Sequence, residues 1–247
     1  MNYEKKPKMI LFDVGGTLLD DGKCNPVDGF EKLRLSALNP DVTNAEKLAE
    51  FWDEYLNEVA GFRSKSGVTL DVPLSAVIKY ATMRAGLVFN VPMAHQEEIF
   101  DRYNSSRAVL DGIPELLQTL DTLGIRTAVI SNNMMSGESL SLALKYWIPS
   151  SNFEFCLTSA DILFTKPSSD IFNCALSYAS LEPSECWYCG DSKTPDVYGS
   201  SHYGISPILI DKFSEKAFEF RSDDNCENYI AVNNWNALTD FLVCGMK

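Results

Sequence analysis

Residues able to do chemistry stand directly after short apolar runs, or in nearby loops, at four separated places in the chain. They are Asp13 in MILFDVGGTLL, Ser131 and Asn132 after TAVI, Lys166 in FTKPSSDIF, and Asp191 and Asp196 in GDSKTPD after CWYC. A carboxylate can attack phosphorus and split one displacement into two easier ones. Attack of one anion on another needs charge neutralisation, which lysine, hydroxyl groups and a metal ion supply. These residue types therefore point to phosphoryl chemistry.

The residues divide into a nucleophile, a metal site and groups that hold phosphoryl oxygens. Asp13 is the predicted nucleophile, and Asp13 with Asp191, supported by Asp196, offers the hard oxygen ligands that Mg²⁺ prefers. We expect Lys166 to neutralise both the nucleophile and the phosphoryl oxygens. The side chains expected to hydrogen-bond those oxygens are Ser131 and Asn132.

Taken singly, each of these residues has an ordinary structural explanation. An acid such as Asp13 can cap a helix or a turn, and a lysine before a proline, as at Lys166, is typically a solvated loop residue. Asp191 lies in a Gly/Ser/Thr/Pro loop, where Asx turns are common. Their joint order favours an active site, because ligands of an open parallel sheet bind outside the carboxyl ends of its strands.

The segments that position these residues alternate between strand and helix patterns. Apolar runs predict strands at 9–12, 127–130, 153–157, 187–189, 207–210 and 229–232, and helical periods predict helices at 113–123 and 168–180. Such alternation is typical of an α/β fold: a Rossmann-like parallel sheet with helices on both faces.

Residues 22–105 interrupt this alternation with helical patterns alone. Thr43 is a predicted helix N-cap, Pro73 opens a further helix, and 94–103 indicates another. An insert of this kind cannot belong to the sheet, so it is predicted to form a helical cap that stands over the site as a lid. The predicted domains are an α/β core at 1–21 and 106–247 and a cap at 22–105.

Composition restricts the partners. The chain has 247 residues and a formal net charge of -13, which disfavours nucleic acid and anionic membrane surfaces. No apolar run reaches the roughly 18–20 residues of a membrane span. Seven cysteines at irregular spacings indicate a reducing cytoplasm. We expect a small phosphorylated molecule as partner and either a monomer or a homodimer.

Four motifs in this order resemble those of the haloacid dehalogenase-like (HAD) hydrolase superfamily. The first family motif is an apolar strand followed by Asp-x-Asp-x-Thr, and here it reads LFDVGGTLL. The matching residues are Asp13 and Thr17, then Ser131, then Lys166-Pro167, and finally Gly190-Asp191 with Asp196. The resemblance covers essentially the whole chain, because the helical insert matches one of the family's cap types. It implies a Mg²⁺-dependent phosphatase that forms an aspartyl-phosphate, with Thr17 among the substrate-binding residues.

Gly15 departs from the first motif. In the family's phosphatases this position holds a second Asp that protonates the leaving oxygen and later activates water, a role worth roughly 10²–10⁴-fold in rate. The resemblance implies that metal binding survives, because this residue offers Mg²⁺ its backbone carbonyl, whereas the proton relay is lost. Two acids just beyond the turn, Asp20 and Asp21, are candidates to replace it.

Three hypotheses account for Gly15. The one we favour is a phosphatase that works slowly or on good leaving groups, such as acyl or aryl phosphates. The second is carbon-centred chemistry, because the family's haloacid dehalogenases and phosphonate hydrolases also lack this Asp. Dehalogenases do not need a metal-type acid such as Asp191, and phosphonate cleavage needs a Schiff-base lysine in the cap. The third is a protein that only binds phosphate or metal, which the retained Asp13 and Lys166 argue against.

The cap is expected to choose the substrate. We predict that Trp52 belongs to the cap's own core. The arginines considered as substrate contacts, and predicted to be solvated instead, are Arg34, Arg63 and Arg84. The lysines considered for a Schiff base are Lys32, Lys47, Lys65 and Lys79.

Overall fold

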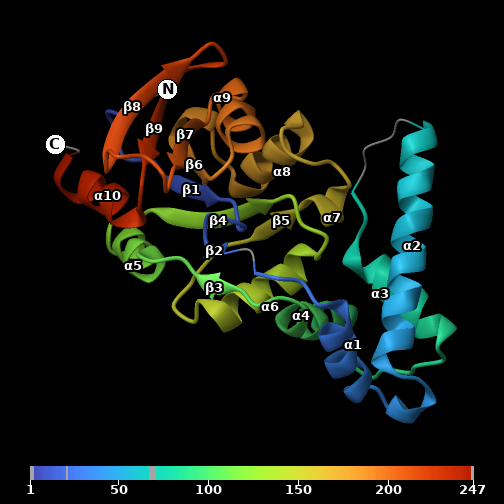
Figure 1. The fold of residues 1–247 in the computed structure, drawn as a ribbon. Coiled ribbons are helices and arrows are strands. Elements are labelled where there is room, and N and C mark those ends of the chain that lie inside the picture. Colours follow the sequence, from blue (N-terminus) through green and yellow to red (C-terminus); the bar gives the residue numbers. More distant parts are fainter. Residues whose placement is uncertain (1–2, 21, 67–70, 246–247) are drawn as a thin grey trace.

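A seven-stranded, mostly parallel sheet forms the centre of the molecule (Figure 1). A computed structural model describes residues 3–20, 22–66 and 71–245. The strand order is β5-β4-β1-β6-β7-β9-β8, and β8 runs antiparallel to β9. The strands are β1 (Met9–Phe12), β4 (Arg126–Ser131), β5 (Cys156–Thr158), β6 (Cys186–Gly190), β7 (Ser206–Ile210), β8 (Phe218–Asp223) and β9 (Cys226–Val232).

Helices cover both faces of the sheet. Successive residues of a strand point to opposite sides, and in the central strands the residues on both sides are buried. In β1, Met9 and Leu11 pack with the buried residues of α8, whereas Ile10 and Phe12 face the opposite layer. That opposite layer holds α5 (Ile113–Thr122), α6 (Gly137–Trp147) and α10 (Trp235–Asp240), and the first holds α8 (Ser169–Ala179) and α9 (Gly199–His202). All residues of β1, β6 and β7 are buried, as expected for strands covered on both faces.

The predicted α/β architecture and parallel sheet are confirmed. The strand predicted at 153–157 is shorter, since β5 begins only at Cys156. β8 has no counterpart among the predicted strands, and it joins the sheet through a tight turn in which the Asp223 carboxylate accepts from the backbone N–H of Asn225 and Cys226. No helix within the described residues is both long and apolar enough to cross a membrane.

A helical segment lies to one side of the sheet, between the short strands β2 (Leu19–Asp20) and β3 (Ala108–Val109) (Figure 1). Its helices, called the cap below, are α1 (Pro26–Leu35), α2 (Ala45–Ser66), α3 (Leu74–Arg84) and α4 (Met93–Asn104). β2 and β3 pair antiparallel, so the chain leaves and re-enters the sheet region along one ribbon. The N-cap of α2 is Asn44, not Thr43, because the Asn44 side chain accepts from the backbone N–H of Lys47 at 2.9 Å.

The cap packs onto the rest of the molecule through α4, which lies against α6. Glu97 of α4 accepts from the backbone N–H and the hydroxyl of Ser136, at 3.2 and 2.5 Å. The backbone N–H of Leu74 donates to the carbonyl of Met134 at 2.6 Å. One continuous apolar cluster extends from the sheet into α3 and α4, so the cap is held by packing as well as by its linkers.

Glu97→Gln tests this contact through the pH dependence of stability. Burial raises the pKa of Glu97, outweighing the hydrogen bonds from Ser136 that lower it. Folding therefore favours the protonated carboxyl, so the contribution of Glu97 to wild-type stability should rise as pH falls through its raised folded-state pKa and level off below the unfolded value of about 4.3. We expect Glu97→Gln to melt above wild type at about pH 8, with the gap closing toward about pH 5 in thermal unfolding followed by circular dichroism.

The control for this experiment is Glu58→Gln, an exposed position on α2. It should leave the melting temperature unchanged at both pH values, because an exposed glutamate carries no burial cost. A gap between wild type and Glu97→Gln that widens on acidification would contradict the burial of a charged Glu97.

Candidate active site

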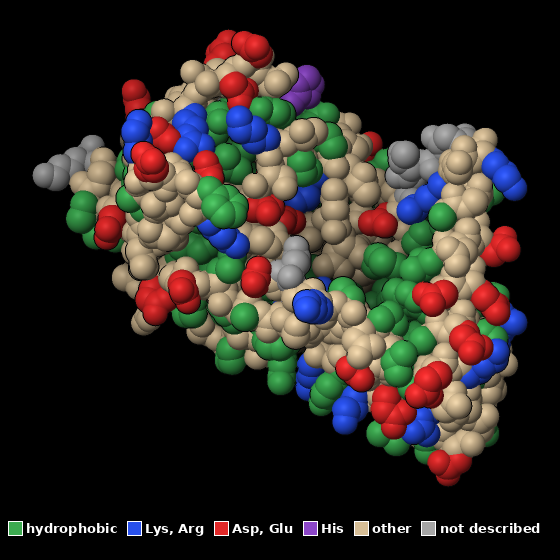
Figure 2. Space-filling model, in the orientation of Figure 1, with side chains coloured by type: hydrophobic (Ala, Val, Ile, Leu, Met, Phe, Trp, Pro, Cys, Tyr) green, Lys and Arg blue, Asp and Glu red, His purple; other side chains and the backbone are tan. Residues whose placement is uncertain are grey.

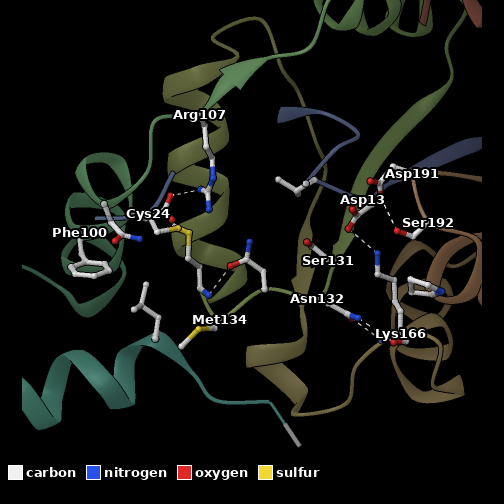
Figure 3. A pocket seen from close by; sticks show the side chains of 18 of the residues that line it. Asp13, Cys24, Phe100, Arg107, Ser131, Asn132, Met134, Lys166, Asp191 and Ser192 are labelled. Carbon is white, nitrogen blue, oxygen red and sulfur yellow. Dashed lines mark hydrogen bonds and ion pairs between the residues drawn. The ribbon is translucent and has the colours of Figure 1, made fainter. Parts of the chain in front are cut away.

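A cavity of about 560 Å³ opens at the carboxyl ends of β1, β4 and β6, in the hollow between the sheet and the cap (Figure 2). Its sheet side is lined by Asp13, Ser131, Lys166, Asp191 and Asp196, which come from the four segments singled out in the sequence. Figure 3 shows Asp13, Lys166 and Asp191 on one side of the cavity and Phe100, Cys24 and Met134 on the other. The strand-end residues are thus brought together.

Lys166 is fixed at the centre of the sheet side. Its Nζ donates three hydrogen bonds of 2.7 Å, to carboxylate oxygens of Asp13 and Asp196 and to the hydroxyl of Tyr188. The Tyr188 hydroxyl donates in turn to the carbonyl of Ile130 at 3.0 Å. Burial alone would lower the pKa of the Lys166 ammonium, but the two carboxylates outweigh it and hold that pKa above its ordinary value. Lys166 is therefore a fixed positive charge whose three N–H groups all have acceptors.

Two glycines make room for the acids of the GDSKTPD loop. Gly16 has a left-handed backbone with φ of +67°, and a Cβ on it would lie 2.2 Å from Oδ2 of Asp191. At Gly190, the last residue of β6, a Cβ would lie 2.4 Å from Cγ of Asp196. A larger residue at either position would displace a carboxylate, so both glycines help to set the positions of these acids.

The acids form a cluster suited to a cation. Asp13, Asp191 and Asp196 each offer a carboxylate oxygen, and these atoms lie within 4.8 Å of one another. Partial burial of the Asp191 carboxyl raises its pKa, and the charge of Asp13 raises it further. Three carboxylates against the single charge of Lys166 leave two negative charges in excess, which a divalent cation would balance. The donors are hard oxygens, so they fit Mg²⁺.

The acids of the cluster are not equivalent as metal ligands. One oxygen of Asp196 accepts from Lys166, and the other accepts from the backbone N–H of Ser192 at 3.0 Å. Asp191 is exposed at the mouth of the cavity, where it accepts a hydrogen bond of 3.2 Å from the Ser192 hydroxyl. Asp13 and Asp191 are therefore the acids best placed to hold a metal ion, with Asp196 behind them.

The other predicted site residues lie at different depths. Ser131 is the last residue of β4. It lines the cavity, and so do Gly15 and Asn132. The Asn132 side chain accepts from the backbone N–H of Lys166 at 2.7 Å and donates to its carbonyl at 3.1 Å, so it fixes the loop that carries the lysine. Thr17 is fully buried and is not among the residues lining the cavity. Contacts of these residues with a substrate stay predictions.

The cap side of the cavity holds residues that the sequence pattern does not single out. Arg107 forms an ion pair with Asp101, and its guanidinium turns into the cavity (Figure 3). Trp52, predicted to be core, is only half-buried; it stacks on Phe100 with ring centroids 5.1 Å apart and lines the cavity. The cap arginines considered as substrate contacts, Arg34, Arg63 and Arg84, are not among the lining residues.

Residues 10–210 match the family model described as haloacid dehalogenase-like hydrolase. The chain belongs to the haloacid dehalogenase-like hydrolases. The matched span contains all four segments of the cavity's sheet side and the cap between the first and the second. This family membership agrees with the resemblance found in the motifs, and it makes the chain a hydrolase.

Proteins similar to this hydrolase include a phosphatase and a dehalogenase. It is 24% identical over 244 residues to the glyceraldehyde 3-phosphate phosphatase of Methanothermobacter thermautotrophicus, a match covering 95% of this chain and 99% of that protein. It is 35% identical over 104 residues to human haloacid dehalogenase-like hydrolase domain-containing protein 3, a match covering 41% of this chain and only 39% of the human protein. A 2-haloacid dehalogenase from Pseudomonas syringae pv. Tomato DC3000 shares the fold, with a TM-score of 0.59, 21% identity and coverage of 96% and 98%.

Proposed function

We propose that this hydrolase is a Mg²⁺-dependent phosphatase that acts on a small phosphorylated metabolite through an aspartyl-phosphate at Asp13. The supporting observation is the excess of negative charge in the cluster of Asp13, Asp191 and Asp196, whose oxygens lie within 4.8 Å of one another. A phosphate ester needs a cation to approach a carboxylate, whereas cleavage of a carbon–halogen bond does not. The match to a phosphatase along nearly the whole chain adds support.

In the proposed reaction Asp13 attacks the phosphorus and the bond from phosphorus to the leaving oxygen breaks. Lys166 orients the Asp13 carboxylate by binding Oδ1 at 2.7 Å. Asp13 and Asp191 would hold Mg²⁺, which would supply positive charge against the phosphoryl oxygens. Ser131 donates a hydrogen bond to one of those oxygens. Water then attacks the phosphorus, which restores the Asp13 carboxylate and releases inorganic phosphate.

A phosphonate hydrolase receives no comparable support. Such chemistry needs a lysine free to form a Schiff base, and the one lysine among the described lining residues is Lys166, which is bound to two carboxylates. Lys47 of the cap does not line the cavity and forms an ion pair with Glu50. The other cap lysines considered, Lys32, Lys65 and Lys79, do not line the cavity either.

Mg²⁺ is expected to raise the melting temperature and to be required for turnover. A ligand that binds only the folded state stabilises it by about 2.7 kcal/mol at a hundredfold excess over Kd. The first measurement compares the melting temperature in MgCl₂ with that in EDTA. The second is phosphate release from acetyl phosphate, a substrate small enough to test the phosphate-binding side of the cavity alone. Asp191→Asn should lose most of both responses.

The matched control is Asp53→Asn, an exposed acid on α2, which should keep both responses. Halide release from a 2-haloacid in EDTA, together with no phosphate release in Mg²⁺, would overturn the proposal in favour of a dehalogenase.

A further inference from the structure

The described residues on the cap side of the cavity offer apolar surface and no net charge. Its apolar lining, called the cap wall below, consists of Pro26, Trp52, Leu74, Phe100 and Met134. Figure 2 shows hydrophobic side chains along this side of the hollow. The charged lining residues there, Arg107 and Asp101, neutralise each other as an ion pair. A planar apolar group would find aromatic and aliphatic contacts on this wall, whereas a charged group would find no free counter-charge among its described residues.

The described part of the cavity lacks a free acid that could protonate a leaving oxygen. Gly15 stands where the family's phosphatases carry that acid. Of the four carboxyl residues among the described lining residues, three form the cluster, and the fourth, Asp101, is ion-paired with Arg107. Asp20 is exposed and does not line the cavity, and Asp21 lies outside the described residues. The leaving oxygen must therefore depart without help from these groups.

We infer that the substrate is an aryl phosphate whose ring lies on the cap wall and whose oxygen leaves as a phenolate; this inference rests on the proposed phosphatase function. A phenol such as the tyrosine side chain has a pKa of about 10, whereas water, which aliphatic alcohols resemble, is a much weaker acid with a far higher pKa. Departure as an anion is thus far easier for a phenol, and it removes the need for an acid at position 15. The missing acid and the aromatic wall point to the same class of substrate.

Each step balances without a further reactant. Asp13 forms a bond to phosphorus as the phosphorus–aryl oxygen bond breaks, and the electron pair stays on the oxygen. The phenolate leaves and takes a proton from bulk water. A second water attacks the phosphorus of the aspartyl-phosphate, the Asp13 oxygen–phosphorus bond breaks, and the proton lost by that water passes to solvent or phosphate. Gly15 supplies no base to this second step either, so we expect hydrolysis of the aspartyl-phosphate to limit turnover.

A leaving-group series tests the inference on the wild-type protein. The substrates are substituted phenyl phosphates whose phenols have pKa values from about 7 to about 10, with n-propyl phosphate and acetyl phosphate for comparison. We expect kcat/KM to rise steadily as the pKa of the phenol falls. 4-Nitrophenyl phosphate should exceed n-propyl phosphate by about 10²-fold or more, the range of the missing acid's contribution.

Trp52→Ala tests the wall itself. It should lower kcat/KM for 4-nitrophenyl phosphate about tenfold, through lost ring contact, and leave acetyl phosphate within about twofold, which also shows that the variant is folded. Phe62→Ala removes an exposed aromatic residue of the same helix outside the cavity and should change neither rate.

The outcomes separate this inference from the proposed function. Turnover of acetyl phosphate in Mg²⁺ with no dependence on phenol pKa, or with aryl and alkyl phosphates cleaved equally, overturns the aryl substrate and leaves the phosphatase standing. An equal loss on acetyl and aryl phosphates in Trp52→Ala overturns the assignment of the ring to the cap wall. No phosphate release from any substrate overturns both proposals.

Discussion

Asp13→Asn is expected to lower Mg²⁺-dependent phosphate release by about 10⁴-fold or more, as removal of a nucleophile does in other covalent mechanisms. A neutral amide is a poor nucleophile and a weaker metal ligand than a carboxylate. The change keeps the shape of the side chain, and Lys166 retains its bonds to Asp196 and Tyr188, so the fold should survive. Phosphate release from acetyl phosphate measures the first effect, and thermal unfolding checks the second.

The Mg²⁺ response separates the two roles of Asp13. If this residue is both nucleophile and metal ligand, Asp13→Asn should also reduce the melting-temperature shift in MgCl₂, as Asp191→Asn does. Asp191→Asn should then leave a slow residual turnover that Asp13→Asn lacks, because it removes a ligand and not the attacking group. Wild-type turnover in Asp13→Asn would rule out a covalent intermediate at this residue.

Much of the sheet side of the site is predictable because strand ends are local features. A short apolar run followed by Asp13, or by Ser131, marks the place where a strand stops, and the carboxyl ends of parallel strands share one edge of the sheet. The acids after β6 follow from the same rule. The glycines of these motifs also indicate where the acids lie. A Cβ on Gly16 would overlap Asp191, and a Cβ on Gly190 would overlap Asp196.

The cap side is not predictable in this way, because it depends on how distant segments dock. Arg107 and Asp101 are an ordinary charged pair in sequence, and they line the cavity only because α4 packs against α6. Trp52 has the spacing of a core residue and meets the cavity only because Phe100 supports one face of its ring. The prediction for Asn132 overlooked a tertiary contact, its pairing with the backbone of Lys166.

Gly15→Asp is the second change with a large expected effect, an increase in rate. It restores the acid that the family's phosphatases carry, so steady-state hydrolysis of n-propyl phosphate should rise by about 10²–10⁴-fold. The residue of the turn that has a left-handed backbone is Gly16, with φ of +67°. The substitution changes Gly15, the residue before it, and leaves Gly16 in place. With 4-nitrophenyl phosphate, wild type should release one equivalent of phenolate in a burst before slow turnover. Gly15→Asp should shorten or abolish that burst, because the new base activates the water that hydrolyses the aspartyl-phosphate.

Gly15→Asn is the matched control. The asparagine side chain has the same size as aspartate, but its amide cannot act as the general acid or base. If position 15 lacks only the catalytic acid, Gly15→Asp should accelerate the hydrolysis of alkyl phosphates and remove the burst, and Gly15→Asn should do neither. Equal loss of activity in both variants would mean that glycine is needed for space, and that the natural substrate fills the room left by the missing side chain. An increase in kcat/KM, which reports the aspartyl-phosphate-forming step, on alkyl phosphates but not on aryl phosphates would show that the aryl oxygen leaves without a proton, as the cap wall and Gly15 together require.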